Sequence, residues 1–154
     1  DAAQNAWVVA NAERYYREAI RILKPLGERG HLCENERKLA QLLVERGKLD
    51  EAERVALEAR ETVGPEDAVS QLTTALALGV VRAAQHRDVE AERLLRLAVD
   101  GLHRSAFRAS EPEALRYLIG FLCERGRAEE AVPFEARLAE LDLVVPTEPA
   151  ARIA

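Results

Sequence analysis

Apolar side chains recur every three or four residues through most of this chain, with polar side chains between them, and that period is the period of an α-helix. Seven segments carry the pattern: residues 3–29, 33–46, 50–63, 67–84, 88–103, 112–125 and 128–141. No segment alternates apolar and polar residues as a half-buried strand does, and the short apolar run at 141–145 has no second strand to pair with. The pattern therefore predicts an all-α protein of about seven helices.

Glycine and proline mark the ends of several of these segments. Gly47 and Gly126 each follow a helical run at the position where a C-terminal glycine ends a helix. Pro112 suits the first turn of the helix that it begins. Pro25 and Pro133 instead lie inside helical patterns, where proline removes a backbone donor and clashes with the preceding turn. We therefore expect the first helix to end or kink near residue 24 and the last helix to bend.

A Glu-Ala pair occurs three times, four residues after a turn residue. The copies are Gly47 to Glu51-Ala52, His86 to Glu90-Ala91, and Gly126 to Glu130-Ala131. The three alanines are 39 and 40 residues apart, which is the spacing of a repeated helix pair. Such pairs bury their apolar faces by stacking on their neighbours. The spacing predicts a stack of helix pairs, with the alanines at helix contacts.

The small residues of the first copy resemble those of tetratricopeptide repeats, a family in which each unit is a pair of antiparallel helices. Ala40, Gly47, Ala52 and Ala59 fall where that family keeps small residues so that the two helices can approach, and Leu43 supplies packed bulk. The resemblance implies a right-handed α-solenoid and a single repeat domain over residues 1–154. Its units would be a degenerate opening unit, three repeats and a non-helical tail, at residues 1–30, 33–65, 72–104, 112–143 and 144–154.

The later copies depart from the family pattern at a few positions. His86 stands in place of the turn glycine in the middle copy, and Pro133 and Glu135 are unusual in the last one. A narrower resemblance concerns residues 64–71, which are followed by a long apolar helix. They are similar to the repeat tails of multidomain bacterial cyclases and of transcriptional regulators that carry an NTPase module. Because the chain begins at Asp1 and contains no Met, we also interpret it as a piece of a longer protein.

Composition narrows the class of partner. Hydrophobic residues make up 48% of the chain and charged residues 32%, a balance typical of helical proteins. The net charge of −5 lacks the basic excess of nucleic-acid-binding proteins, so we expect no nucleic-acid partner. No run of about 18 apolar residues is present, and we expect no membrane span. Cys33 and Cys123 form no paired motif, which favours free thiols and a cytoplasmic location.

The sequence carries no motif of catalytic or metal chemistry. His31, His86 and His103 fall near predicted helix ends without an HExxH motif or a Cys/His spacing, and they suit the polar ends of helices better than a metal site. The glycines are isolated at turns and form no phosphate-binding loop. Acidic pairs such as Glu129-Glu130 lie at a helix start, where they complement the helix dipole. We therefore expect no enzyme activity, metal or cofactor.

The resemblance implies that the first helix of each pair lines a concave groove for a protein or peptide. The positions carried over are Arg37, Gln41 and Glu45 in the first pair, Thr73, Leu76 and Val80 in the second, and Arg116, Tyr117, Gly120 and Glu124 in the third. Leu76 and Val80 would form an apolar patch between Arg37 and Arg116, suited to an amphipathic or acidic peptide. Ala77 and Glu113 occupy the positions of the family's carboxylate clamp, which argues against recognition of chaperone C-termini.

The first helix carries an apolar stripe of its own: Trp7, Val8, Ala12, Tyr15, Ala19, Ile22, Leu23 and Leu26. We expect Trp7 to pack beneath the following repeat, and Tyr16, which lies beside Tyr15 on another face, to be the better surface candidate. The favoured function is a non-enzymatic binding scaffold or sensor of a larger signalling or regulatory protein. One alternative is a homo-oligomer formed through exposed solenoid ends. Another is a helical support domain of a multidomain enzyme such as a nucleotide cyclase.

Overall fold

The computed structural model describes residues 1–144, and within them every regular element is helical. The elements are α1 (Ala2–Leu26), α2 (Arg29–Glu45), α3 (Leu49–Thr62), α4 (Ala68–Ala84), α5 (Asp88–Arg104), the 3-10 helix η1 (Arg108–Ser110), α6 (Glu111–Glu124) and α7 (Ala128–Val144). The prediction of an all-α protein with seven α-helices is confirmed for this part of the chain. The rest of the predicted tail, residues 145–154, lies outside the described residues.

Three helix boundaries differ from the predicted ones, and neither proline inside a helix ends that helix. α1 continues through Pro25 to Leu26 and ends at Gly27, whose φ of 67° is left-handed. α7 contains Pro133 and continues to Val144, so the predicted end at residue 141 is too early. α2 begins at Arg29, four residues before the predicted start, because the carboxylate of Glu28 accepts a hydrogen bond from the backbone N–H of His31 at 2.8 Å.

The three repeated turns share one backbone conformation. Gly47, His86 and Gly126 have φ angles of 73°, 58° and 73°, in the left-handed region. The next residue in each turn donates its N–H to a carbonyl five residues back, as Lys48 does to Leu43 at 2.9 Å and Arg87 does to Arg82 at 2.9 Å. This is the Schellman arrangement that ends a helix. The glycine pattern seen in the sequence thus extends to a histidine.

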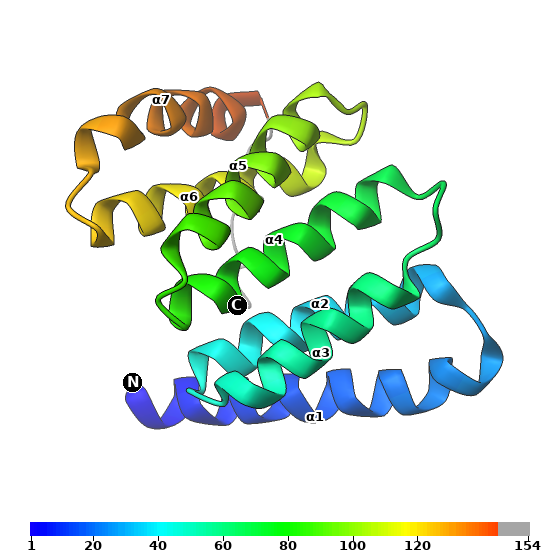
Figure 1. The fold of residues 1–154 in the computed structure, drawn as a ribbon. Helices are drawn as coiled ribbons and strands as arrows, with labels where there is room; N and C mark the ends of the chain where they lie inside the picture. Colours follow the sequence, from blue (N-terminus) through cyan, green and yellow to red (C-terminus); the bar gives the residue numbers. More distant parts are fainter. Residues whose placement is uncertain (145–154) are drawn as a thin grey trace, which may run out of the picture.

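Consecutive helices pack against each other from α1 at one end to α7 at the other (Figure 1). In addition α4 contacts both α2 and α6, so these three helices form a row, which we call the inner row. The alanines of the three Glu-Ala pairs, Ala52, Ala91 and Ala131, have no exposed surface. They are buried on α3, α5 and α7, as expected for alanines at helix contacts.

Two clusters of buried side chains form the core. One is centred on Leu39, Leu43, Val55 and Leu78. The other includes residues of α4, α5, α6 and α7 and contains Leu76, Leu95, Leu102, Leu115, Leu118 and Leu122, all at most 1% exposed. Gly79 lets α4 and α5 approach, since a Cβ at that position would lie 3.1 Å from the Cβ of Leu94. No helix among residues 1–144 is both long and apolar enough to span a membrane.

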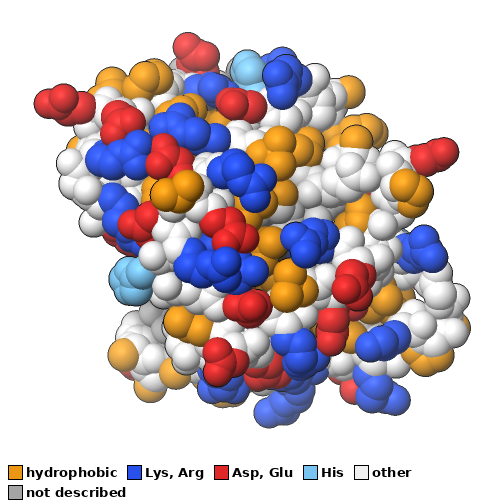
Figure 2. All heavy atoms as spheres, viewed as in Figure 1, with side chains coloured by type: hydrophobic (Ala, Val, Ile, Leu, Met, Phe, Trp, Pro, Cys, Tyr) orange, Lys and Arg blue, Asp and Glu red, His pale blue; other side chains and the backbone are white. Residues whose placement is uncertain are grey.

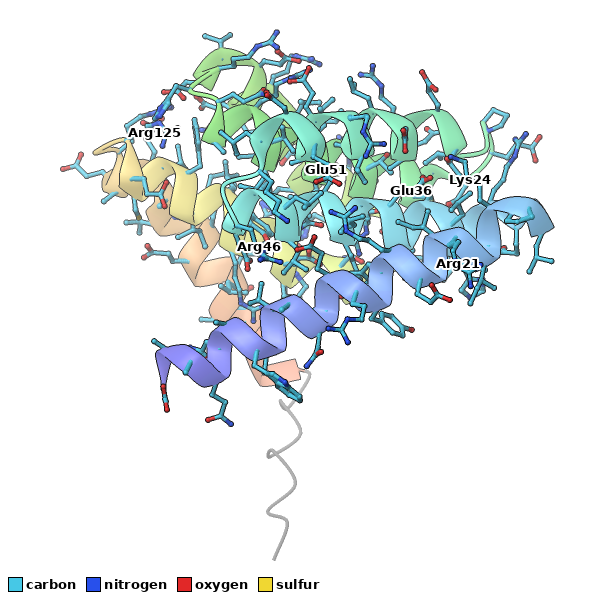
Figure 3. All side chains as sticks on the ribbon, turned by 90° about the horizontal axis from the view of Figure 1, so that it is seen from below. Arg21, Lys24, Glu36, Arg46, Glu51 and Arg125 are labelled. Atoms are coloured by element: carbon cyan, nitrogen blue, oxygen red, sulfur yellow. The ribbon has the colours of Figure 1, made fainter. Side chains whose placement is uncertain are left out.

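The face of α1 that meets the rest of the molecule combines apolar side chains, such as Tyr16 and Ile20, with one buried carboxylate. Its only buried residue is Glu13, whose carboxylate binds Arg17 at 2.8 Å, Lys48 at 3.2 Å and also Arg46. Arg46 lies between α1 and the other helices in Figure 3. Arg17 forms a further ion pair with Glu51 of α3 at 2.7 Å.

The expectation that Trp7 packs beneath the following repeat is wrong. Trp7 is 68% exposed and Tyr15 is 67% exposed, whereas Tyr16 is half-buried against the first core cluster. The reason is the rotation of α1: Glu13 lies about 160° around the helix from Tyr15. When Glu13 binds the turn between α2 and α3, the apolar stripe is directed to solvent.

Candidate partner-binding groove

A hollow of about 310 Å³, which we call the inner hollow, lies against the inner row. Its lining comes from four helices, α2, α4, α5 and α6, and from the turns after α4 and α6. The residues are Val44, Val80, Ala83, Ala84, His86, Leu95, Arg116, Tyr117, Gly120, Phe121, Glu124 and Arg125. Tertiary packing therefore brings together the C-terminal ends of α2 and α4 with one face of α6.

The floor of the inner hollow is apolar. Val80, Leu95 and Phe121 are at most 8% exposed and belong to the second core cluster. Val44 and Tyr117 are half-buried and pack against the same cluster. A floor of this kind can accept an apolar side chain without leaving a buried polar group unpaired.

The rim of the inner hollow carries two arginines that differ in how many contacts hold them. Arg125 is fixed, because it donates to Asp88 at 3.0 Å and to the carbonyl of Ala83 at 2.9 Å and lies 4.8 Å from the centre of the Phe121 ring. Arg116 is 56% exposed, and the one ion pair that it forms within residues 1–144, with Asp142, is long at 3.6 Å. Arg116 is therefore the cation that can turn toward an acidic ligand.

A second hollow of about 190 Å³ adjoins the first at Tyr117. It is lined by Ala12, Tyr16, Lys38, Gln41, Leu42, Glu45, Glu113 and Tyr117. Burial raises the pKa of the Tyr117 hydroxyl, and a hydrogen bond with Gln41 acts in the opposite direction. The shared tyrosine makes the two hollows neighbouring parts of one surface.

Polar side chains connect α2 to α6 across the inner row. Glu113 accepts a hydrogen bond from Gln41 Nε2 at 2.8 Å and one from Arg37 Nη1 at 3.3 Å. Arg37 also donates to both oxygens of Glu34 at 2.7 Å and to Gln41 at 3.1 Å. Because Arg37 is 3% exposed and its donors are occupied, it holds helices together and is not free to meet a partner.

The structure separates the ten predicted groove positions into three groups. Five line the inner hollow: Val80, Arg116, Tyr117, Gly120 and Glu124. Gln41 and Glu45 join Tyr117 in the second hollow. Arg37, Thr73 and Leu76 are buried, and Leu76 has no exposed surface at all. The apolar patch expected from Leu76 and Val80 is therefore replaced by the floor of the inner hollow.

Seven residues that line the inner hollow were absent from the predicted groove: Val44, Ala83, Ala84, His86, Leu95, Phe121 and Arg125. Val44 and Phe121 could have been found from helical period, because they follow Gln41 and Tyr117 by three and four residues. His86 and Arg125 lie at turns after α4 and α6, where no period applies. The packing of α2, α4 and α6 against one another places these two residues at the hollow.

Over the face seen in Figure 2, basic and acidic side chains alternate and do not gather by sign. Many of them are paired between helices, as Arg127 is with Glu92 at 2.7 Å and Arg82 is with Glu53 at 2.8 Å. Among residues 1–144, no group of three or more His, Cys, Asp or Glu side chains could hold a metal ion. Cys33 is buried and Cys123 is exposed, and both are free thiols.

These features define a helical protein of sequentially packed helices with a hollowed inner row. Comparison with protein-family models, with curated proteins and with solved structures found no match. The two hollows on the inner row are therefore the features from which a function can be proposed.

Proposed function

We propose that this chain is a tetratricopeptide-like solenoid of antiparallel helix pairs that binds a segment of another protein in the inner hollow. Three turns 39 and 40 residues apart share one left-handed backbone conformation, and this regular spacing supports the repeat proposal. The contacts of α4 with both α2 and α6 support an inner row of first helices. In this proposal the chain is a non-enzymatic scaffold or sensor module of a larger bacterial regulatory protein.

The observation that carries the proposal is the apolar floor of the inner hollow beside an arginine rim. A volume of about 310 Å³ is at the lower end of ligand pockets, which suits one or two apolar side chains of a bound segment. Arg116 and Arg125 stand next to that floor, and arginine binds carboxylates through paired hydrogen bonds. The preferred partner is a short amphipathic segment with an acidic residue beside its apolar anchor.

Gly120 offers a test that does not damage the fold. A Cβ at Gly120 would meet no other heavy atom within 4 Å, so Gly120→Leu should fill the hollow without a clash in the core. Peptides with acidic, neutral and basic flanks around an apolar anchor are screened on an array, and binders are measured by fluorescence anisotropy. We expect Gly120→Leu and Arg116→Glu each to weaken binding of acidic peptides at least about tenfold.

The matched charge control is Arg93→Glu on α5, an exposed arginine that lines none of the hollows described above. It changes the net charge as Arg116→Glu does and should bind like the wild type. Arg37→Glu is a poor probe, because it would leave a buried site without its cation. If both hollow variants bind like the wild type, or if no peptide of the set binds at about 100 μM, the proposed groove is wrong.

A further inference from the structure

Helix α1 carries apolar side chains on two faces, one packed against the rest of the molecule and one uncovered. Toward α2 it presents Glu13 and its ion pairs, with Tyr16 and Ile20 as the apolar contacts. On the other side five large apolar side chains are between 51% and 71% exposed: Trp7, Val8, Tyr15, Ile22 and Leu26. We call these five residues the α1 stripe. Only four other large apolar side chains among the described residues are exposed, and they are scattered over α5, α7 and the loop after α5.

The stripe has the spacing of a helix–helix seam. Val8, Tyr15 and Ile22 are seven residues apart, and Leu26 follows four residues later. Ala12 and Ala19 lie between them, so that the steps along the seam alternate between four and three residues. This is the repeat that keeps a helix in contact with another helix along its length. A helix of 25 residues is about 37 Å long and provides room for such a seam.

We propose that the α1 stripe binds the α1 stripe of a second copy of this chain, in an antiparallel pair centred on Tyr15. The stripe is symmetric about that residue, with Val8 seven positions before it and Ile22 seven positions after it. An antiparallel pair with its two-fold axis at Tyr15 therefore packs Val8 of each copy against Ile22 of the other. A two-fold interface requires this self-complementarity of one surface.

The charges beside the stripe select the antiparallel direction. Arg14 and Glu18 are exposed and lie on the same flank of the stripe, about 40° apart around the helix. Two-fold antiparallel packing sets this flank against itself, with Arg14 of one copy about 3 Å along the axis from Glu18 of the other. Parallel packing would set the same flank against the opposite one, which carries Tyr16 and Leu23 and offers no charge. Glu18 at present binds Arg21 of its own helix at 2.9 Å, an exposed pair that can be shared.

The apolar area is sufficient for a dimer. From the usual side-chain areas and the exposed fractions, the stripe exposes roughly 600 Å² in each chain, about the largest patch expected on a monomer. Two copies would bury roughly 1,200 Å² between them, which is the lower end of specific interfaces. The stripe lies outside the inner hollow, so the dimer and the proposed peptide binding can fail independently.

The first test is the mass of the protein in solution. Sedimentation velocity between about 1 and 100 μM should show a shift from 17.1 kDa to twice that mass. Tyr15→Asp and Ile22→Asp should weaken dimerisation at least about tenfold, with unchanged far-UV circular dichroism because both side chains are exposed. The control is Val89→Asp on α5, which is 88% exposed and should dimerise like the wild type. A wild type that remains at 17.1 kDa, or stripe variants that dimerise normally, would overturn the proposal.

The second test is the direction of the pair. In a Cys123→Ser background, which removes the exposed native thiol, Val8→Cys protein is mixed with Ile22→Cys protein and oxidised. The antiparallel pair predicts a disulfide between the two different variants and little cross-linking of either variant with itself. Cross-linking of Val8→Cys with itself would indicate parallel helices and would overturn the arrangement centred on Tyr15.

Discussion

At the scale of single residues, His86 shows that a helix-ending turn can hold a residue other than glycine in the left-handed conformation. It adopts a φ of 58° where the two other repeated turns have glycine. A residue with a Cβ loses roughly 1–2 kcal/mol in this left-handed conformation, whereas glycine adopts it freely. The turn forms nevertheless, because its hydrogen bonds to Ala83 and Arg82 and the packing of both helices require it.

Replacing the turn residues should therefore change stability in opposite directions. We expect His86→Gly to raise the free energy of unfolding by about 0.5–1 kcal/mol, since the relief of strain exceeds the added flexibility of the unfolded chain. Gly47→Ala and Gly126→Ala should lower it by about 1 kcal/mol or more. Urea denaturation at neutral pH measures all three. A His86→Gly variant no more stable than the wild type would contradict this account of the turn.

Glu13 makes the attachment of α1 sensitive to acid. Burial by itself raises the pKa of this carboxyl, but hydrogen bonds from Arg17, Lys48 and Arg46 outweigh it and lower the pKa from 4.5 to about 2. The folded state thus binds the proton less readily than the unfolded state. The stabilisation is complete above pH 4.5 and is lost as the pH falls from 4.5 toward about 2.

A shift of this size corresponds to roughly 3 kcal/mol of unfolding free energy, and we expect solvent screening at the half-exposed Arg46 and Lys48 to reduce the loss to roughly 1–2 kcal/mol. Urea midpoints at several acidic pH values measure it, with Glu13→Gln as the comparison. The variant should be less stable at neutral pH and should have a shallower acid slope than the wild type. Parallel slopes for the two proteins would mean that Glu13 is not the responsible carboxyl. Glu92, whose pKa is lowered to about 2 mainly by a hydrogen bond from Arg127, accounts for part of the remaining slope.

At the scale of elements, two glycines in the middle of helices have different reasons to be there. A Cβ at Gly79 of α4 would lie 3.1 Å from Leu94 Cβ, so this glycine permits close contact with α5. Gly120 of α6 borders the inner hollow and has open space beside it. Nothing in the packing of α6 requires a glycine there.

The two substitutions to alanine should separate these roles. Gly120→Ala should raise the free energy of unfolding by about 0.5–1 kcal/mol, because alanine favours the helix and meets no neighbour. Gly79→Ala should forfeit that gain and cost about 1 kcal/mol or more, since α5 must move away. Thermal and urea denaturation of both variants check the difference. Equal effects at the two positions would show that the α4–α5 contact is less tight than described.

At the scale of the whole molecule, the uncovered α1 stripe and the inner hollow give the chain two separate surfaces. If α1 pairs with a second copy, the melting temperature of the wild type should rise with protein concentration, because the dimer binds only the folded state. Ile22→Asp should remove that dependence and leave peptide binding at the inner hollow unchanged. Such a result would describe a dimer that presents two binding hollows.

The sequence by itself determined the local structure of this protein. Periodicity predicted seven helices, glycines and one histidine marked the turns, and the Glu-Ala spacing placed Ala52, Ala91 and Ala131 where they are buried. These features depend on neighbours along the chain, which the sequence displays directly. Half of the groove positions carried over from the family resemblance also line the inner hollow.

The tertiary structure alone decided which faces are covered. Periodicity showed that α1 carries an apolar stripe but not which way it faces, and the ion pairs of Glu13 turn that stripe to solvent. Likewise Arg37 is buried because Glu113, 76 residues later, comes within 3.3 Å of it. Burial depends on contacts between residues distant in sequence, and those contacts exist only after the helices have packed.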